Sequence, residues 1–402
     1  MIFSEIADIN PKVKLSRGEA YPFVEMSDIT PGKRYVKAEN NKIFKGGGSK
    51  FEPNDVLFAR ITPCLENGKI AQFKGSNKIA GFGSTEFFVF RAKRGISDGG
   101  FLYYLASSDV LRKPAEGSMF GASGRQRAVL EVVRSVEIPK ISLTNQRKIS
   151  VALSAYDDLI ENNIRRIRIL EEMCQRIYRE WFVDFRFPGH GKVKFAKSEL
   201  GMIPVKWEIN KLGDICNITM GQSPKSEFYN ENGDGLPFHQ GVTDFNRIFP
   251  KTRMFCTVQN RIANEGDILF SVRAPVGRIN IANIKIIIGR GLCAIRSKTN
   301  HQCLVYLLLK EKFKEEDTMG GGTIFKSVTK DDVHTIQVLY PPEELIRSFE
   351  DIVEPALRSL KNLTIKNENL RLSRDILLPK LISGEIDVSE IDIAIQEQEN
   401  GA

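Results

Sequence analysis

Three glycine-rich segments carry side chains that could read a nucleic acid. They are MFGASGRQR (119–127), MGQSPKSEF (220–228) and MGGGTIFKS (319–327). Glycines let backbone amides approach a phosphate, while a long Arg or Gln side chain can enter a groove and pair with guanine or adenine. For each candidate the alternative is a surface or ion-paired side chain. The candidate contact residues are Arg60, Ser123, Arg125, Gln126, Arg127, Gln222, Ser223, Lys225, Arg273, Arg278, Thr323 and Lys326.

Motifs for catalysis are absent from the sequence. It has no N/D-P-P-Y/F motif to grip an extruded adenine, no F-x-G-x-G cofactor loop and no G-x-x-x-x-G-K-S/T phosphate loop, and GGGSK (46–50) lacks the spacing of the last. No convincing P-D…D/E-x-K nuclease pattern occurs. The four histidines lack metal-ligand spacing, and the six cysteines include no C-x-x-C pair. We therefore predict a chain that holds no metal and catalyses nothing alone.

The positive charge is concentrated in two parts of the chain. Residues 1–140 carry 22 Lys and Arg against 15 Asp and Glu, residues 184–340 carry 22 against 16, and residues 341–402 carry 7 against 13. A basic surface binds a polyanion because each neutralised phosphate releases counterions, but a merely solvated surface explains the surplus equally well. No apolar run approaches the roughly 18 residues that span a bilayer, so we expect a cytoplasmic protein of two or more domains.

The chain repeats itself once. PNDVLFARITP (53–63) recurs as EGDILFSVRAP (265–275) at an offset of 212 residues. GFG (81–83) aligns with GRG (289–291), LYYL (102–105) with LVYL (304–307), and the glycine-rich segment at 119–127 with that at 319–327. An offset that shrinks along the chain is expected when two copies of one fold differ in loop length. A period near 200 residues indicates a duplicated domain and excludes a solenoid.

Each copy is followed by a proline-bearing turn and a long amphipathic stretch, which is a helix-start pattern. Apolar residues recur about every 3.5 residues, as they do where one helix packs on another along a narrow seam. Asn163 and Asn367 lie in this seam and could fix its register, although Asn163 could instead be frayed and exposed. Pro355 is expected to kink the second helix or to move its start to about residue 356. The predicted seam, which could also bind partners, comprises Leu153, Ile160, Ile167, Leu170, Ile177, Leu360, Leu363, Leu370 and Leu377.

The sequence predicts two similar globular α+β domains separated by two long antiparallel coiled-coil helices. Short β-branched and aromatic runs such as VLFAR and IKIIIG are typical of strands, and FLYYLASSDVLRK is typical of a helix. At about 1.5 Å per residue each long helix would span roughly 50 to 60 Å and give the chain a pseudo-two-fold axis. The predicted segments are a first domain (1–140), a helix (141–183), a surface linker (184–206), a second domain (207–340), a helix (341–383) and an acidic, strand-like or disordered tail (384–402).

These features resemble the specificity (S) subunit of type I restriction-modification enzymes. The similar strings are WEINKLGDICNITMGQSP (207–224), GDILFSVRAPVG (266–277), YREWFVDF (178–185) and DILLPKLISGEID (375–387), of which the last two are the most specific. The likeness covers nearly the whole chain. One departure is that the first repeat opens with FSEIADINPKVKL (3–15), which lacks the W-x-x-x-x-L-G-D form of the second.

The resemblance implies a non-catalytic subunit that binds a bipartite, asymmetric site on double-stranded DNA. Each globular domain would be a target-recognition domain that reads one half of the site. The helices would space the halves and bind two methyltransferase and two restriction and translocation subunits. Those partners would use S-adenosylmethionine, ATP and Mg²⁺, with no cofactor in this chain. The alternatives are an enzyme with unrecognised catalytic residues, a coiled-coil scaffold, or a DNA-binding protein that acts without a restriction complex.

Overall fold

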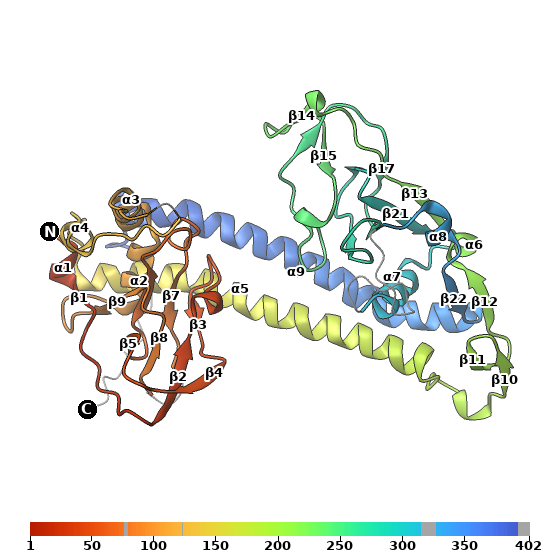
Figure 1. Ribbon diagram of the computed structural model, residues 1–402, viewed down its shortest axis with the longest axis horizontal. Coiled ribbons are helices and arrows are strands. Elements are labelled where there is room, and N and C mark those ends of the chain that lie inside the picture. The colour runs from red at the N-terminus through yellow and green to blue at the C-terminus, as the bar shows by residue number, and fades with distance from the viewer. Residues whose placement is uncertain (76–78, 123, 315–326, 393–402) are drawn as a thin grey trace. The chain divides into compact units, whose positions relative to one another are not determined.

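The computed structural model describes residues 1–75, 79–122, 124–314 and 327–392, which belong to two compact units (Figure 1). The N-terminal unit comprises Met1–Arg165 and Thr364–Ala402, and the central unit comprises Arg166–Leu363. The two long helices, α5 (Leu143–Tyr178) and α9 (Glu343–Ser383), each contribute to both units. The fold is of the α+β class, as predicted.

The N-terminal unit contains two sheets. One has the strand order β1-β9-β6-β7-β3 and the other the order β4-β2-β8-β5, in which β2 and β8 are parallel. Its elements are α1 (Phe3–Ile6), β1 (Ala7–Ile9), β2 (Ala20–Val24), η1 (Met26–Asp28), β3 (Tyr35–Val36), β4 (Asn40–Ile43), β5 (Ser49–Phe51), β6 (Val56–Ala59), β7 (Ile70–Phe73), β8 (Gly81–Gly83), β9 (Phe87–Ala92), α2 (Gly99–Ser107), α3 (Asp109–Gly117) and α4 (Leu130–Ser135).

The central unit contains two larger sheets, β13-β21-β18-β19 and β14-β16-β15-β20-β17, and the strand pairs β10-β11 and β12-β22. Its elements are η2 (Arg179–Val183), η3 (His190–Lys192), β10 (Phe195–Ser198), β11 (Gly201–Pro204), β12 (Glu208–Lys211), α6 (Leu212–Ile215), β13 (Cys216–Met220), η4 (Ser226–Phe228), β14 (Tyr229–Asn230), β15 (Leu236–His239), η5 (Val242–Asp244), β16 (Phe255–Cys256), β17 (Ile262–Ala263), β18 (Ile268–Ser271), β19 (Ile279–Ile281), β20 (Ile286–Ile288), β21 (Leu292–Ser297), α7 (Gln302–Lys312), α8 (Lys330–His334) and β22 (Gln337–Tyr340).

The two units repeat one topology. The antiparallel run β1-β9-β6-β7 corresponds to β13-β21-β18-β19, and the parallel pair β2-β8 corresponds to the parallel pair β15-β20. The turn after β6 and the turn after β18 each contain a cis peptide bond before proline, at Pro63 and Pro275. The repeat seen in the sequence is therefore a repeat of structure.

A buried aspartate of the repeated motif forms the same ion pair in both units. Asp55 binds Arg91 on β9 at 2.7 Å, and Asp267 binds Arg296 on β21. Burial raises the pKa of each aspartate, and the arginine opposes that rise by stabilising the charged carboxylate. Each ion pair links two neighbouring strands of the antiparallel sheet.

The structure corrects one alignment within the repeat. GFG (81–83) forms β8, whose counterpart is β20 and not GRG (289–291), because β8 and β20 each lie between a parallel and an antiparallel neighbour. The N–H of Arg60 binds the carbonyl of Glu86 at 3.0 Å, as the N–H of Val272 binds that of Gly291 at 2.9 Å. GRG therefore aligns with residues 84–86.

The first repeat has a counterpart of the L-G-D element. Helices α1 and α6 both precede the first strand of the antiparallel sheet. The Glu5 carboxylate accepts the N–H of Ile2 at 3.1 Å, and the Asp214 carboxylate accepts the N–H of Lys211 at 3.1 Å. F-S-E at residues 3–5 thus replaces L-G-D, because either acid can cap the helix.

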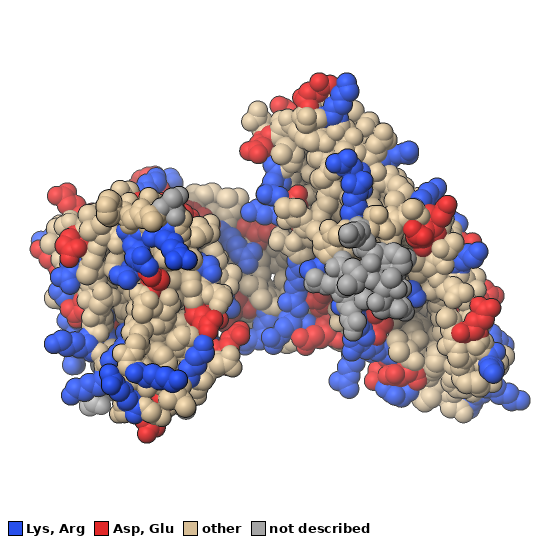
Figure 2. Space-filling view, viewed as in Figure 1, with Lys and Arg blue, Asp and Glu red and all other residues tan. Residues whose placement is uncertain are grey.

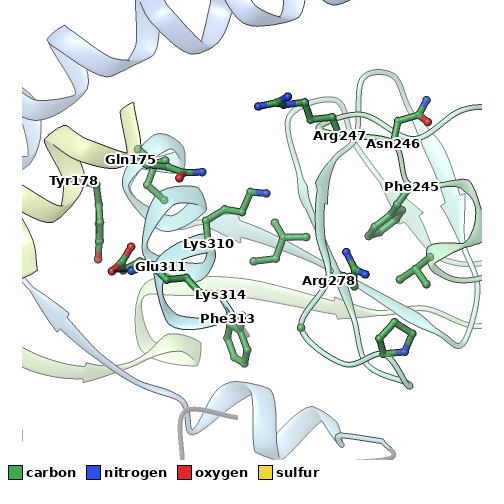
Figure 3. A pocket seen from close by; sticks show the side chains of 15 residues that line it. Gln175, Tyr178, Phe245, Asn246, Arg247, Arg278, Lys310, Glu311, Phe313 and Lys314 are labelled. Carbon is green, nitrogen blue, oxygen red and sulfur yellow. Dashed lines mark hydrogen bonds and ion pairs between the residues drawn. The ribbon is translucent and has the colours of Figure 1, made fainter. Parts of the chain in front are cut away.

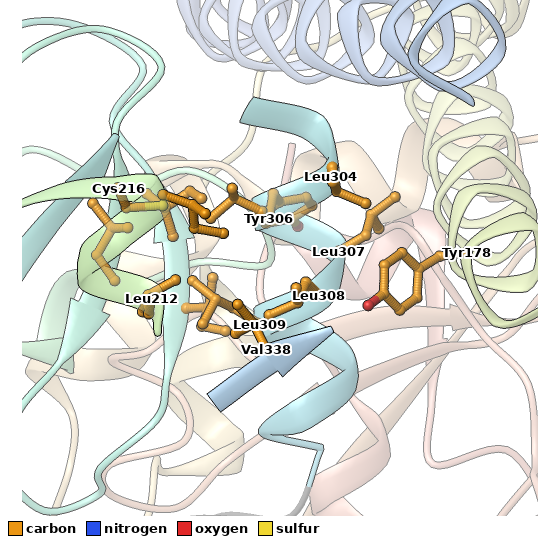
Figure 4. Close-up of a cluster of buried hydrophobic side chains, with 14 of the residues drawn as sticks. Tyr178, Leu212, Cys216, Leu304, Tyr306, Leu307, Leu308, Leu309 and Val338 are labelled. Atoms are coloured by element: carbon orange, nitrogen blue, oxygen red, sulfur yellow. The ribbon is translucent and has the colours of Figure 1, made fainter. Parts of the chain in front are cut away.

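Each unit has its own apolar core. In the central unit α7 buries Leu304, Tyr306 and Leu307 against α6, β22 and the end of α5 (Figure 4). In the N-terminal unit the corresponding residues of α2, Leu102, Tyr104 and Leu105, are buried beneath the antiparallel sheet. The aligned strings LYYL and LVYL therefore form equivalent core helices.

The long helices begin and end where local hydrogen bonds favour it. The Ser142 hydroxyl accepts the N–H of Asn145 at 3.3 Å at the start of α5. Helix α9 begins directly after Pro342 and ends before Gly384, whose φ of 80° suits a residue without a side chain. Pro355 lies inside α9, so the predicted start at residue 356 is wrong.

Neither long helix, nor any other helix in the described residues, is apolar enough over its length to cross a membrane.

The two long helices pair antiparallel within each unit. In the N-terminal unit the Asn163 side chain donates to the Asn367 side chain at 2.8 Å, and both are buried, which excludes an exposed Asn163. In the central unit Ile167 and Leu360 pack in one cluster, and the Tyr178 ring contacts the Phe349 ring. The predicted seam residues are all buried or half-buried.

Two segments predicted to lie at the surface instead pack onto a core. The linker (184–206) forms the hairpin β10-β11, and its Phe187 and Ile203 join the core of the central unit. The start of the acidic tail is neither a strand nor detached, because Val388 is buried in the N-terminal core and Lys148 donates to its carbonyl at 3.1 Å. Apolar residues spaced along both segments supply the energy for this burial.

Candidate nucleic-acid interface

The glycine-rich loop of the N-terminal unit lies against the turn that follows β6. The N–H of Thr62 binds the carbonyl of Gln126 at 3.0 Å, and the N–H of Ala128 binds the carbonyl of Arg60 at 2.8 Å. The fold thus brings together candidates that are more than 60 residues apart. Ser123, in the same loop, is outside the described residues.

Two of the candidate arginines share one carboxylate. Arg127 binds Glu86 at 2.6 Å, and Arg60 binds the same side chain at 3.2 Å. Hydrogen bonding from Arg127, followed by that from Arg60, holds the pKa of Glu86 below its usual value, so Glu86 is ionised at neutral pH. In the described residues Arg125 is exposed and makes no ion pair. Together the loop and the turn after β6 therefore present Arg125, which has no ion pair in the described residues, and Arg127 and Arg60, whose charges are partly offset by Glu86.

Beside this loop runs a groove of about 680 Å³ whose lining has three lysines and Arg60 but no Asp or Glu. We call it the lysine groove after Lys12, Lys14 and Lys50. Lysine and arginine side chains also gather on the face of the N-terminal unit seen in Figure 2. A carboxylate-free groove of this kind is suited to a phosphate backbone.

Backbone geometry holds the lysine groove open. The Asn10 side chain accepts the N–H of Val89 on β9 at 3.0 Å, which fixes the turn that presents Lys12 and Lys14. Gly48 has a φ of 86°, and a Cβ there would lie 2.4 Å from the carbonyl oxygen of Gly83. Only glycine permits this approach of β5 to β8, which places Lys50 on the groove wall.

The central unit presents a different set of groups at the equivalent place. The hydroxyl of Ser223 donates to the Gln240 side chain at 2.7 Å and accepts the N–H of Arg290 at 3.2 Å. A Cβ on Gly221 would lie 2.1 Å from the carbonyl oxygen of Gly289, so this contact also depends on glycine. Gln222 is exposed beside Ser223. Amide, hydroxyl and guanidinium groups here replace the lysines of the N-terminal unit.

Among the remaining candidates of the central unit, Lys225 lies two residues after Ser223, and the others are distant from it in the sequence. The Lys225 side chain is 82% exposed and lies 3.7 Å from Glu227. Arg273 pairs with Ser327 in a β-bridge, as Ile61 does with Arg127. Thr323 and Lys326 are outside the described residues.

Arg278 lines a cavity of about 480 Å³ with Arg247, Lys310 and Lys314 (Figure 3). The acidic Glu311 also lines this cavity, and Arg247 is bound by Glu171 at 2.6 Å. Burial, aided by the neighbouring arginines, lowers the pKa of Lys310. The cavity is a second basic concavity of the central unit.

Sequence reasoning missed five residues of this interface: Lys12, Lys14, Lys50, Gln240 and Arg290. The signal for two of them was present, because IADINPKVKL aligns with ICNITMGQSP once α1 is matched to α6. Lys12 and Lys14 then fall opposite Gly221 and Ser223. The other three come from strands or turns whose pairing the sequence does not specify.

One histidine, His301, lies between two carboxylates of α9. His301 faces Glu343 at 2.8 Å and Glu350 at 3.2 Å, where it joins the start of α9 to the sheet. In the described residues no three His, Cys, Asp or Glu side chains are placed to hold a metal ion. All six cysteines are free thiols.

Comparison with known proteins identifies relatives along the chain. Residues 204–368 match the family model described as the type I restriction modification DNA specificity domain. The putative type I restriction enzyme MjaX specificity subunit of Methanocaldococcus jannaschii is 30% identical over 349 residues, which cover 83% of this chain and 79% of that protein. The HindI specificity subunit of Haemophilus influenzae is 23% identical and covers 91% of this chain and 95% of that protein. The crystal structure of a type I S subunit from M. genitalium shares the fold, with 21% identity, 95% coverage of both chains and a TM-score of 0.60.

Proposed function

Because the chain belongs to the specificity subunits of type I restriction enzymes, we propose that it reads a bipartite, asymmetric DNA sequence and catalyses no reaction itself. The N-terminal unit would read one half-site and the central unit the other. Each unit would bind through the glycine-rich surface described above, with phosphate contacts fixing its position and side chains in a groove reading base edges.

The observation that carries this proposal is that one topology presents different side chains at equivalent positions. A homodimeric reader has identical surfaces and recognises identical half-sites. Here the surfaces differ, so the half-sites should differ too. Lys12 and Lys14 are matched in the central unit by Gly221 and Ser223. Lys50 on β5 is matched by Ile262 on β17, because each strand pairs antiparallel with β8 or β20, and Thr85 of the groove lining is matched by Arg290.

The chemistry would come from partner subunits. Two methyltransferase subunits would use S-adenosylmethionine, and two restriction and translocation subunits would use ATP and Mg²⁺. The long helices support a docking role, since large apolar side chains remain exposed on them, including Ile365, Leu372 and Ile376 of α9. Exposed apolar residues in a row on a helix are typical of a protein interface.

Mapping methylated bases in the host genome, with and without this gene, tests the proposal. We expect methylation to disappear from one motif made of two different specified halves with an unspecified spacer between them. Unchanged methylation after deletion of the gene, or loss at a continuous or palindromic motif, would refute the proposed reading of two unlike half-sites.

A further inference from the structure

We propose that the ring of Phe120 inserts between base pairs of the DNA half-site bound by the N-terminal unit, an inference that rests on the proposed function. At 83% exposure Phe120 is the most exposed large apolar side chain in the described residues. It occupies the rim of the glycine-rich loop, the segment with the candidate arginines. Nothing in the described chain covers it.

The loop holds the backbone of Phe120 in place. The N–H of Phe120 binds the carbonyl of Arg127 at 3.1 Å, and the N–H of Arg127 binds the carbonyl of Phe120 at 3.0 Å. Gly121 and Gly124 have φ of 135° and 78°, a backbone conformation that favours glycine at both positions. A ring on a paired backbone can enter a base stack with little loss of conformational freedom, as an apolar wedge requires.

The charges around Phe120 favour DNA over an apolar protein surface. Arg125 is exposed on the same loop, and Arg127 is the direct backbone partner of Phe120. The acid bound to Arg127 is Glu86, which is already shared with Arg60. An apolar ring flanked by cations suits a DNA duplex, because the faces of the bases are apolar and the sugar–phosphate backbone beside them is negatively charged.

The test uses the full chain, alone and assembled with its methyltransferase subunit, and a duplex that carries the mapped site with 2-aminopurine at successive positions. Wild-type protein should raise the fluorescence at one base step, because unstacking relieves quenching of this base. Phe120→Ala should abolish that rise and weaken binding about tenfold, whereas Phe120→Tyr should keep both. Ile96→Ala, which removes an apolar side chain that is 47% exposed in the same unit, is the matched control and should change neither.

Three results would overturn the inference in distinguishable ways. Unchanged fluorescence and affinity in Phe120→Ala would show that the ring does not enter the stack. If Phe120→Ala no longer binds the methyltransferase subunit but binds DNA normally, Phe120 contacts a protein and not the base stack. Equal binding of wild-type protein to the mapped site and to an unrelated duplex would refute the proposed function, and the inference with it.

Discussion

Some basic residues at the interface of the N-terminal unit form ion pairs with a carboxylate, and others do not. Arg60 and Arg127 share Glu86, whereas the lysine groove has no carboxylate in its lining. An ion-paired arginine must exchange one partner for another when it binds DNA, while an unpaired lysine simply displaces counterions. We therefore expect the lysines to contribute affinity for any sequence and the arginines to contribute more to selectivity.

Replacing Lys14 and Lys50 together with alanine should weaken binding to every duplex, whatever its sequence. The slope of log K against log salt should become shallower by roughly 0.9 for each phosphate that the variant no longer neutralises. Titrations at several salt concentrations measure this slope. Lys113→Ala is the control, because Lys113 is exposed on α3 and bound to Asp109 at 2.6 Å. A slope equal to that of the control would exclude the lysine groove as a phosphate site.

Glu86→Gln should strengthen binding to an unrelated duplex by about two- to tenfold at low salt, because it removes a negative charge from two arginines. The pKa of Glu86 is held low, so the carboxylate is charged at neutral pH and the substitution removes that charge fully. Acidification below this lowered pKa should have the same effect on wild-type protein. Glu116→Gln, which removes an acid bound to Arg112 at 3.1 Å, is the control. Weaker or unchanged binding would contradict this account.

The sequence predicted which residue types lie at the interface better than it predicted which of them form ion pairs. Glycine spacing located the loop at 119–127 because positive φ angles there require glycine. The pairing of Arg127 with Glu86 could not be predicted, since it depends on how the loop docks beside β9. The lysine groove joins four separate segments of the N-terminal unit, so its assembly depends on their tertiary contacts.

Among the elements, the paired long helices were the most predictable, because apolar residues spaced about 3.5 positions apart over several turns are typical of helices packed along a narrow seam. The hairpin β10-β11 and the buried start of the tail were missed. Both segments are short and rich in polar residues or glycine, so only their tertiary contacts determine their structure. The alignment of GFG with GRG was wrong for the same reason. Which residues of the two units are equivalent is determined by strand pairing, which matching glycines in the sequence do not reveal.

The Asn163–Asn367 hydrogen bond should fix the alignment of α5 against α9 in the N-terminal unit. Asn163→Leu alone should lower the free energy of unfolding by about 1–3 kcal/mol, because the buried side-chain oxygen of Asn367 loses its donor, while the Asn367 amide nitrogen still donates to the carbonyl of Ile160. Replacing both with leucine should restore most of the loss. Urea unfolding, with amide exchange to locate the effect, measures this. Ile164→Ala, at a 40% exposed neighbour, is the control. A double variant as unstable as the single one would contradict the pairing argument.

The exposed apolar residues of α9 should bind a methyltransferase subunit. Leu372→Ser with Ile376→Ser should reduce co-purification of that subunit by about tenfold or more, since a few central apolar contacts dominate an interface. These side chains are 62% and 52% exposed, so the chain should fold normally. Ile43→Ser, at a 59% exposed position on β4, is the control. Full retention of the partner by the α9 variant would exclude this stripe as the docking site.

For the whole molecule, the central feature is one fold present twice with different surfaces. The four-strand antiparallel run, the parallel strand pair and the buried Asp–Arg pairs are shared by the two units, while the side chains of the two candidate interfaces are not. The elements that form the fold are thus shared by both copies, while the side chains available to bases differ. This arrangement allows each half of a recognised sequence to change independently of the other.

The most direct test is to replace residues 1–140 with the corresponding domain of another specificity subunit and to map methylated bases in cells that carry the chimaera. The account predicts a new motif in which one half is altered while the other half remains as in the wild type. A motif in which both halves change, or neither does, would contradict independent reading by the two units.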